Sequence, residues 1–254
     1  EDPVRMLRAV RFATKLGFRI EAETEQPIKA LAPLLGDIPP ARLFDEMLKL
    51  FLGGSALDNF EMLRHYNLFE QLFPLTERAL GHEENHFPLM LIARGMANTD
   101  KRIEEDKPVT PAFLFALFLW QPVRERAAQL EAEGQHPAQA MQHAGSQMIA
   151  EQAAVLATPR RFSLPMRDIW MLQLRLENKG GRRSVRALSH PRFRAAYDFL
   201  LLRAAAGEVP QDLADWWTEF QETHADQIAQ PASRPRPRKR RRNRSRRKPE
   251  GQTG

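Results

Sequence analysis

The chain has 254 residues, of which 43% are hydrophobic, enough to bury a core as one large or two small domains. The absence of cysteine excludes disulfides and thiolate zinc sites, and the longest apolar run, Ala112 to Trp120, is shorter than the roughly 18 residues of a membrane span. The net charge of +6 hides an asymmetry, because residues 1–230 hold 27 Lys or Arg against 31 Asp or Glu. We therefore expect a protein without a membrane role, in the reducing cytoplasm.

The residue pattern predicts an all-α fold. Apolar residues recur with helical spacing, Val and Ile are scarce beside Leu and Ala, and no stretch alternates with period two. Residues 99–109 are charged and poor in apolar side chains, so we expect a flexible connection there. Capping residues, Gly and Pro place the helices at 3–17, 21–34, 40–52, 55–66, 86–98, 111–120, 122–133, 137–156, 165–178, 191–206 and 210–227.

The first of these helices begins at Asp2, whose carboxylate caps free N–H groups, with Pro3 at the first helical position. Asp2, Arg5 and Arg8 share its polar face. The opposite stripe should face the core and consists of Leu7, Val10, Thr14 and Phe18.

A carboxylate beside an arginine can recognise a base edge that offers one donor and one acceptor. Adenine and cytosine present this order through an amino group beside a ring nitrogen, whereas guanine and uracil present the reverse. On spacing alone, the alternative is that Asp2 is only a helix cap and the arginines only a solvated face.

The same helix carries a longer motif, Glu1-Asp2-x-x-Arg5 followed by Arg8-x-x-Arg11-Phe12. Further motifs follow at 16–18, 38–43, 45–50, 59–61, 68–74, 164–183 and 190–204. Together they resemble the class II nucleotidyltransferases, the family of bacterial poly(A) polymerases and CCA-adding tRNA nucleotidyltransferases. The last two segments resemble the carboxy-terminal region of the poly(A) polymerase branch.

This resemblance implies that Asp2 and Arg5 hold the base of ATP, the substrate, and that Arg8 and Arg11 orient the base or the phosphates. It also implies a catalytic head whose paired carboxylates bind Mg²⁺, and no such motif is present in this sequence. We expect the chain to be the carboxy-terminal part of a longer enzyme and inactive alone. The expected divisions are a neck at 1–75, a helical body at 76–230 and a tail at 231–254.

The expected tail holds 11 Lys or Arg against one acid, Glu250. Residues 231–248 contain no apolar residue larger than Ala or Pro, so they cannot bury enough surface to fold and should be disordered. Their expected partner is RNA, although a solubilising or protein-binding tail, for example for RNA-decay proteins, is the alternative. The expected RNA contacts are Arg238, Lys239, Arg240, Arg241, Arg242, Arg244, Arg246, Arg247 and Lys248.

A second basic region lies within the body. Ten basic residues occur between Arg160 and Arg194, and we expect Arg182 and Arg183 to contact RNA. Aromatic residues in the same region could stack on bases, but helical spacing favours Trp170 in the core. The other two aromatic candidates are Phe162 and Phe193.

Three motifs suggest chemistry that their context disfavours. A zinc-protease pattern occurs at His82-Glu83-Glu84-Asn85-His86. Gly81 and Pro88 flank this segment, which indicates a polar connector and not the interior of a helix. Gly53-Gly54-Ser55 reads as a helix stop followed by a serine cap. Asn243-Arg244-Ser245 fits a glycosylation acceptor within an arginine-rich tail that lacks a secretion signal.

The function expected from the sequence is therefore the addition of AMP from ATP to RNA 3′ ends, by a longer enzyme to which this chain contributes base recognition and RNA binding. The resemblance leaves two alternatives. A CCA-adding tRNA nucleotidyltransferase uses the same scaffold, and Asp2 with Arg5 cannot separate adenine from cytosine. A non-catalytic RNA-binding module is the other.

Overall fold

A computed structural model describes residues 2–81 and 88–224 of the chain. Its regular structure in these residues is entirely helical, with no strand, which confirms the all-α prediction. No helix in the described part of the chain is long and apolar enough to cross a membrane. The helices are α1 (Val4–Leu16), α2 (Ala22–Glu25), α3 (Ile28–Leu31), the 3₁₀ helix η1 (Ala32–Asp37), α4 (Pro40–Phe51), α5 (Ala56–His65), α6 (Leu68–Leu72), α7 (Pro74–Leu80), α8 (Leu89–Glu104), α9 (Pro111–Phe118), α10 (Trp120–Ala132), α11 (Pro137–Ala153), α12 (Arg160–Leu176), α13 (Gly181–Leu188), α14 (Phe193–Ala205) and α15 (Gln211–Thr223).

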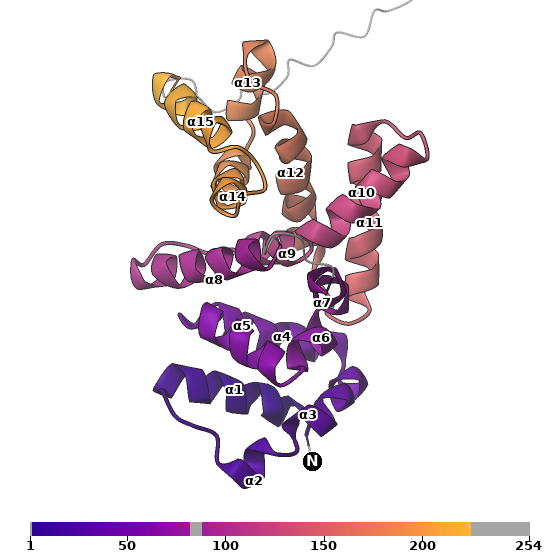
Figure 1. Ribbon diagram of the computed structural model, residues 1–254, viewed down its shortest axis with the longest axis vertical. Helices are drawn as coiled ribbons and strands as arrows, with labels where there is room; N and C mark the ends of the chain where they lie inside the picture. Colours follow the sequence, from indigo (N-terminus) through magenta and orange to yellow (C-terminus); the bar gives the residue numbers. More distant parts are fainter. Residues whose placement is uncertain (1, 82–87, 225–254) are drawn as a thin grey trace, which may run out of the picture.

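The helices stack in layers along the long axis of the molecule (Figure 1). Helix α1 lies near one end, with α2 beyond it, and packs on α4 and α5, and α5 packs in turn on α8. Beyond α8 and α9 the chain forms two arms, the hairpin of α10 and α11 and the group of α12 to α15.

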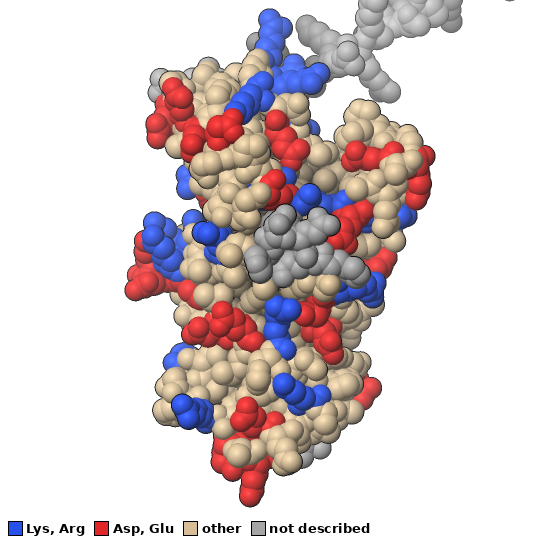
Figure 2. All heavy atoms as spheres, viewed as in Figure 1, with Lys and Arg blue, Asp and Glu red and all other residues tan. Residues whose placement is uncertain are grey.

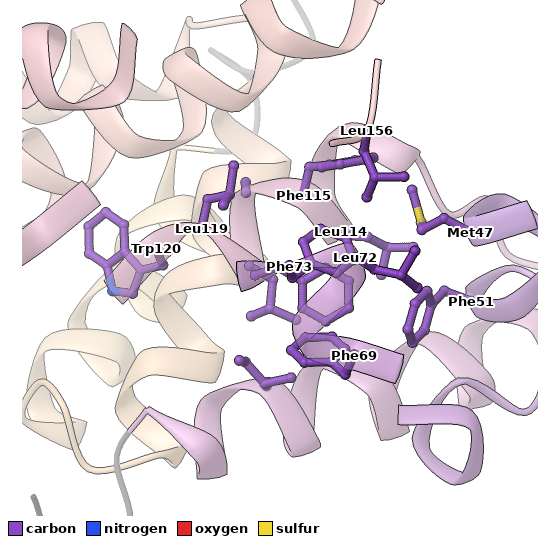
Figure 3. Close-up of a cluster of buried hydrophobic side chains, with 14 of the residues drawn as sticks. Met47, Phe51, Phe69, Leu72, Phe73, Leu114, Phe115, Leu119, Trp120 and Leu156 are labelled. Atoms are coloured by element: carbon purple, nitrogen blue, oxygen red, sulfur yellow. The ribbon is translucent and has the colours of Figure 1, made fainter. Parts of the chain in front are cut away.

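A continuous hydrophobic core runs through most of these layers. It extends from Met6 in α1 to Leu202 in α14, so the residues on both sides of the boundary expected at 75/76 share one core. Its centre is aromatic, with Phe69, Phe73 and Phe115 close together (Figure 3). Aromatic pairs at these separations add to the free energy of burial. Division of the chain into neck and body at residue 75 remains a prediction.

A second, smaller core joins the end of α12 to α13, α14 and α15. Trp217 is fully buried there, and its indole N–H donates a 2.6 Å hydrogen bond to the carbonyl oxygen of Leu176. Arg203 on α14 is only 3% exposed and contacts Gln173, Glu177 and Glu208.

Two expected helices have different bounds from those predicted, and the apolar stripe of a third is shorter than expected. The helix expected at 21–34 is broken into α2, α3 and η1, because Pro27 cannot continue a helix. The helix expected to begin at Pro165 begins at Arg160, and Pro165 lies within α12, where its ring nitrogen cannot donate to the carbonyl of Arg161. The apolar stripe of α1 ends early, because Gly17 adopts the left-handed conformation and Phe18 is 67% exposed.

The flexible connection expected at 99–109 is also partly wrong, because α8 continues to Glu104. Asp100 of this segment makes a tertiary contact, because its carboxylate accepts from the backbone N–H groups of Ala56 and Leu57. Thr99 is buried and donates to the carbonyl oxygen of Gly95 within α8. Three helices were not predicted, namely α6, α7 and α13.

Candidate nucleotide and RNA interface

A surface cavity beside α1 brings together two of the predicted base-contacting residues. It has a volume of about 600 Å³ and lies between α1 and the segment from α2 to η1. Asp2 and Arg5 line it, and Arg5 is exposed. Its apolar lining includes Ile28, Leu31 and Leu34. A base placed against this lining could bury a flat face while its edge meets Asp2 and Arg5.

Both carboxylate oxygens of Asp2 have hydrogen-bond donors within the protein. Oδ1 accepts a 3.2 Å bond from the backbone N–H of Val4, so Asp2 caps the start of α1 as expected. Oδ2 accepts from the guanidinium of Arg42 on α4. The hydrogen bond from Arg42 is the main reason why the pKa of Asp2 lies below its usual value. An ionised carboxylate has about four acceptor positions, so Asp2 can accept a further bond from a base amino group.

Arg8 is held by a neighbouring helix. Its guanidinium donates a 3.3 Å hydrogen bond to Oε1 of Glu46 on α4, and Lys49 donates to the same oxygen at 2.9 Å. Burial of Glu46 opposes its ionisation, but the bonds from Lys49 and Arg8 outweigh this effect, and the pKa of Glu46 lies below its usual value. Arg8 is not among the residues that line the cavity beside Asp2.

Arg11 is turned towards a different neighbour. Its guanidinium carbon lies 4.6 Å from the centre of the Phe12 ring, and Arg11 does not line the cavity of Asp2 and Arg5. The structure therefore groups Asp2 with Arg5 and Arg42, and Arg8 with Glu46 and Lys49. A nucleotide role of Arg8 and Arg11 remains a prediction.

Sequence reasoning missed Arg42 and Glu46 as partners of the site. A signal was present, since residues 42, 46 and 49 lie on one face of an amphipathic helix and bear charges of alternating sign. What the sequence alone did not reveal is that this face meets α1.

The predicted RNA-binding pair Arg182 and Arg183 lies in the first turn of α13 and is exposed. Lys and Arg side chains gather over α13 at one end of the molecule (Figure 2). Trp170 and Phe193 are buried, at 1% and 4% exposure, which confirms the core interpretation and removes both from base stacking. Phe162 is half-buried and packs against the larger core.

Several predicted features lie outside the described residues. These are the tail contacts Arg238, Lys239, Arg240, Arg241, Arg242, Arg244, Arg246, Arg247 and Lys248, the acceptor pattern at 243–245 and the histidines of the 82–86 motif. Within residues 2–81 and 88–224, no group of three or more His, Asp or Glu residues is placed to hold a metal ion.

The Gly53-Gly54-Ser55 segment separates α4 from α5, as expected of a helix stop. Ser55 occupies the position before α5, but its side chain makes no capping hydrogen bond. The serine cap is therefore wrong, and the Asp100 carboxylate takes its place at the start of α5.

Comparison with known proteins identifies two family models that together match most of the chain. Residues 17–80 match a model described as "Probable RNA and SrmB- binding site of polymerase A", and residues 133–249 match one described as "Polymerase A arginine-rich C-terminus".

Two curated relatives extend this similarity. Poly(A) polymerase I of Haemophilus influenzae is 44% identical over 234 residues, covering 91% of this chain and 51% of the relative. Poly(A) polymerase I of Salmonella typhi is 46% identical over 224 residues, covering 87% of this chain and 48% of the relative. The chain thus spans about half the length of these relatives.

Similarity to tRNA nucleotidyltransferases covers less of the sequence. The CCA-adding enzyme of Geobacillus thermodenitrificans is 41% identical over 78 residues, which is 31% of this chain and 19% of the relative. The matches that extend through the helical body are those to poly(A) polymerases, and the chain therefore belongs to the poly(A) polymerase family.

Proposed function

We propose that the chain contributes base recognition and RNA binding to a longer enzyme that adds AMP from ATP to RNA 3′ ends. The observation that carries the proposal is the cavity in which Asp2 and Arg5 lie together beside an apolar wall. Similarity to poly(A) polymerase I over about nine tenths of the chain supports this interpretation. We place this activity in the cytoplasm.

In this proposal the adenine base of ATP enters the cavity beside α1. Asp2 accepts a hydrogen bond from the amino group, and Arg5 donates one to the adjacent ring nitrogen. Arg42 holds the Asp2 carboxylate in place, and the apolar lining of the cavity packs against the base. Mg²⁺, when bound, would stabilise the attacking and leaving oxygens, and the described residues provide no fitting group of ligands for it.

RNA binding is assigned to two basic regions. Arg182 and Arg183 are exposed on α13, and the tail that follows residue 230 supplies 11 further Lys or Arg. Each arginine that neutralises a phosphate releases condensed counterions, so the binding is sensitive to salt and independent of sequence. The name of the matching family model adds a protein partner, SrmB, and we extend the proposal to such a partner for residues 17–80.

The extent of the similarity favours a poly(A) polymerase over the first alternative, a CCA-adding enzyme. A CCA-adding enzyme would share the cavity of Asp2 and Arg5, since cytosine presents the same edge as adenine. The similarity to such enzymes covers about a third of the chain, whereas the similarity to poly(A) polymerases covers the body as well.

The proposal is tested by the ATP kinetics of the longer protein that contains this chain. Arg5→Ala should lower kcat/KM for ATP, because a charged hydrogen bond to the base is lost. The expected decrease corresponds to a loss of about 2–4 kcal/mol of transition-state stabilisation. Asp2→Ala should act in the same direction. Arg19→Ala, an exposed arginine that does not line the cavity, serves as the matched control. If Arg5→Ala and Asp2→Ala match the control, neither residue belongs to the base site.

A further inference from the structure

A second cavity lies far along the chain from Asp2, where α8, α9 and α14 meet. It has a volume of about 250 Å³, and its basic lining residues are Arg102, Arg192 and Arg194. Asp198 is the single carboxylate that lines it. The cavity beside Asp2 has the opposite balance, with one arginine and two carboxylates in its lining.

The arginines of this cavity are only partly neutralised. Asp198 contacts two of them, Arg194 at 3.0 Å and Arg102 at 3.8 Å. The guanidinium of Arg192 has no hydrogen-bond or ion-pair partner among residues 2–81 and 88–224. An excess of positive charge in a concave site raises the local concentration of anions.

The three arginines are positioned by different parts of the fold. Arg102 lies in the last turn of α8, and its Nη2 donates a 3.1 Å hydrogen bond to the carbonyl oxygen of Pro108. Arg192 precedes α14, and Arg194 belongs to its first turn. The packing of α8 on α14 therefore brings together residues that are 90 positions or more apart in sequence.

The rest of the lining is apolar and includes Phe113, Val109 and Pro191. Phe113 packs edge to face on Phe199, with ring centres 5.8 Å apart, so the core holds it in place. A cavity of this size is below the roughly 300–1,000 Å³ of pockets for drug-sized ligands. Its volume and lining suit one nucleotide unit, with the phosphate at the arginines and the base or sugar at the apolar wall.

We propose that this cavity is a subsite for one nucleotide of a single-stranded RNA, separate from the base site of Asp2 and from the basic tail. The proposal rests on the RNA-binding function proposed above. Arg192 and Arg194 contact the phosphate. Asp198 orients Arg194 and Arg102, and the Pro108 carbonyl also holds Arg102 in place. A strand bound here passes across the middle layers of the molecule rather than only along α13 and the tail.

The test uses the complete 254-residue chain and a fluorescein-labelled oligo(A), with affinity measured by fluorescence anisotropy at several salt concentrations. Arg192→Gln and Arg194→Gln should each weaken binding by about threefold to tenfold. Each should also reduce the slope of log affinity against log salt by about 0.7, the value for one phosphate contact on a single strand. Arg194→Lys should recover part of the lost affinity, because it keeps the charge without the fork.

The matched control is Arg94→Gln, which removes an exposed arginine from α8 outside the cavity. Circular dichroism checks that all variants keep their helical content. If the two cavity variants bind oligo(A) with the same affinity as Arg94→Gln, the cavity is not an RNA subsite. This holds whether the three variants keep the affinity of the unaltered chain or all lose it equally.

Two further measurements distinguish an RNA subsite in this cavity from a site for a free anion. A 4-thiouridine placed in the RNA should crosslink to the tryptic peptide that contains Phe113, and Arg192→Gln should reduce the yield of this adduct at an RNA concentration below the dissociation constant. If the variants weaken binding of inorganic phosphate, measured by ³¹P NMR, without weakening RNA binding, the cavity takes a free anion and the proposal is wrong. If the chain binds no RNA at all, the proposed function fails together with the subsite.

Discussion

Replacement of Arg203 by Met should destabilise the protein strongly, because this buried side chain is the centre of a network of hydrogen bonds and ion pairs. Its guanidinium donates to both oxygens of Glu208 at 2.9 Å, to Glu177 at 2.7 Å and to Gln173 at 3.0 Å. It also lies 4.7 Å from the centre of the Trp120 ring. Met preserves the length of the stem but removes all of these donors.

The magnitude follows from the partner that is left behind. The side chain of Glu208 is only 4% exposed, and without Arg203 its remaining contacts are Arg124 at 2.8 Å and the indole N–H of Trp120. Loss of one partner of a buried ion pair costs about 3–5 kcal/mol. Arg124 still offsets part of the charge, so we expect about 3 kcal/mol, or a decrease in Tm of about 6–12 °C for a chain of this size.

The assay is urea unfolding followed by tryptophan fluorescence and circular dichroism. Arg94→Met, on the exposed side of α8, is the control and should change the free energy of unfolding by less than about 0.5 kcal/mol. The double variant Arg203→Met with Glu208→Gln should lose less than the sum of the single variants, because no buried charge is left alone. A loss below about 1 kcal/mol for Arg203→Met, with additive single effects, would refute this reasoning.

The remaining predictions concern α4 and the tail. The pKa of Glu46 is lowered in the folded protein, so its contribution to stability is present above its unfolded value of about 4.5 and is lost as pH falls through the folded value. Glu46→Gln should therefore cost about 1 kcal/mol in urea unfolding at pH 7 and progressively less as the pH is lowered below 4.5, whereas a cost independent of pH would contradict this. Arg42→Ala removes the donor that positions Asp2, so kcat/KM for ATP in the proposed longer enzyme should fall about tenfold, while kcat/KM for RNA stays constant. A loss confined to RNA would place Arg42 outside the base site. Deletion of residues 231–254 should reduce the slope of log RNA affinity against log salt by several units, at about 0.7 for each phosphate contact that is lost. An unchanged slope would assign RNA capture to the helical body.

The sequence predicted those features that depend on local pattern. The start of α1 directly after Asp2 and Pro3, the helical class of the fold and the burial of Trp170 follow from capping chemistry and apolar periodicity. The extent of α8 did not follow, because the charged residues after Thr99 owe their helical structure to tertiary contacts such as Asp100 with α5.

The candidate site was only half predictable for the same reason. Asp2 and Arg5 are one helical turn apart, so their proximity is encoded locally. Arg42 is 40 positions from Asp2, and Glu46 is 38 positions from Arg8, so these pairs depend on how α4 crosses α1. The arginine cavity between α8 and α14 depends on still longer separations, and a basic cluster read along the sequence does not reveal it.

The most direct test of the proposed function is a 3′-extension assay with the longer enzyme proposed above. An unstructured RNA with a free 3′ hydroxyl is incubated with Mg²⁺ and with ATP or CTP as the single nucleotide, and the 254-residue chain alone is the control. The account predicts a long run of A from ATP, little extension from CTP and no AMP addition by the chain alone. Addition of a short, defined C-containing end that then stops, or Mg²⁺-dependent AMP addition by the chain alone, would contradict it.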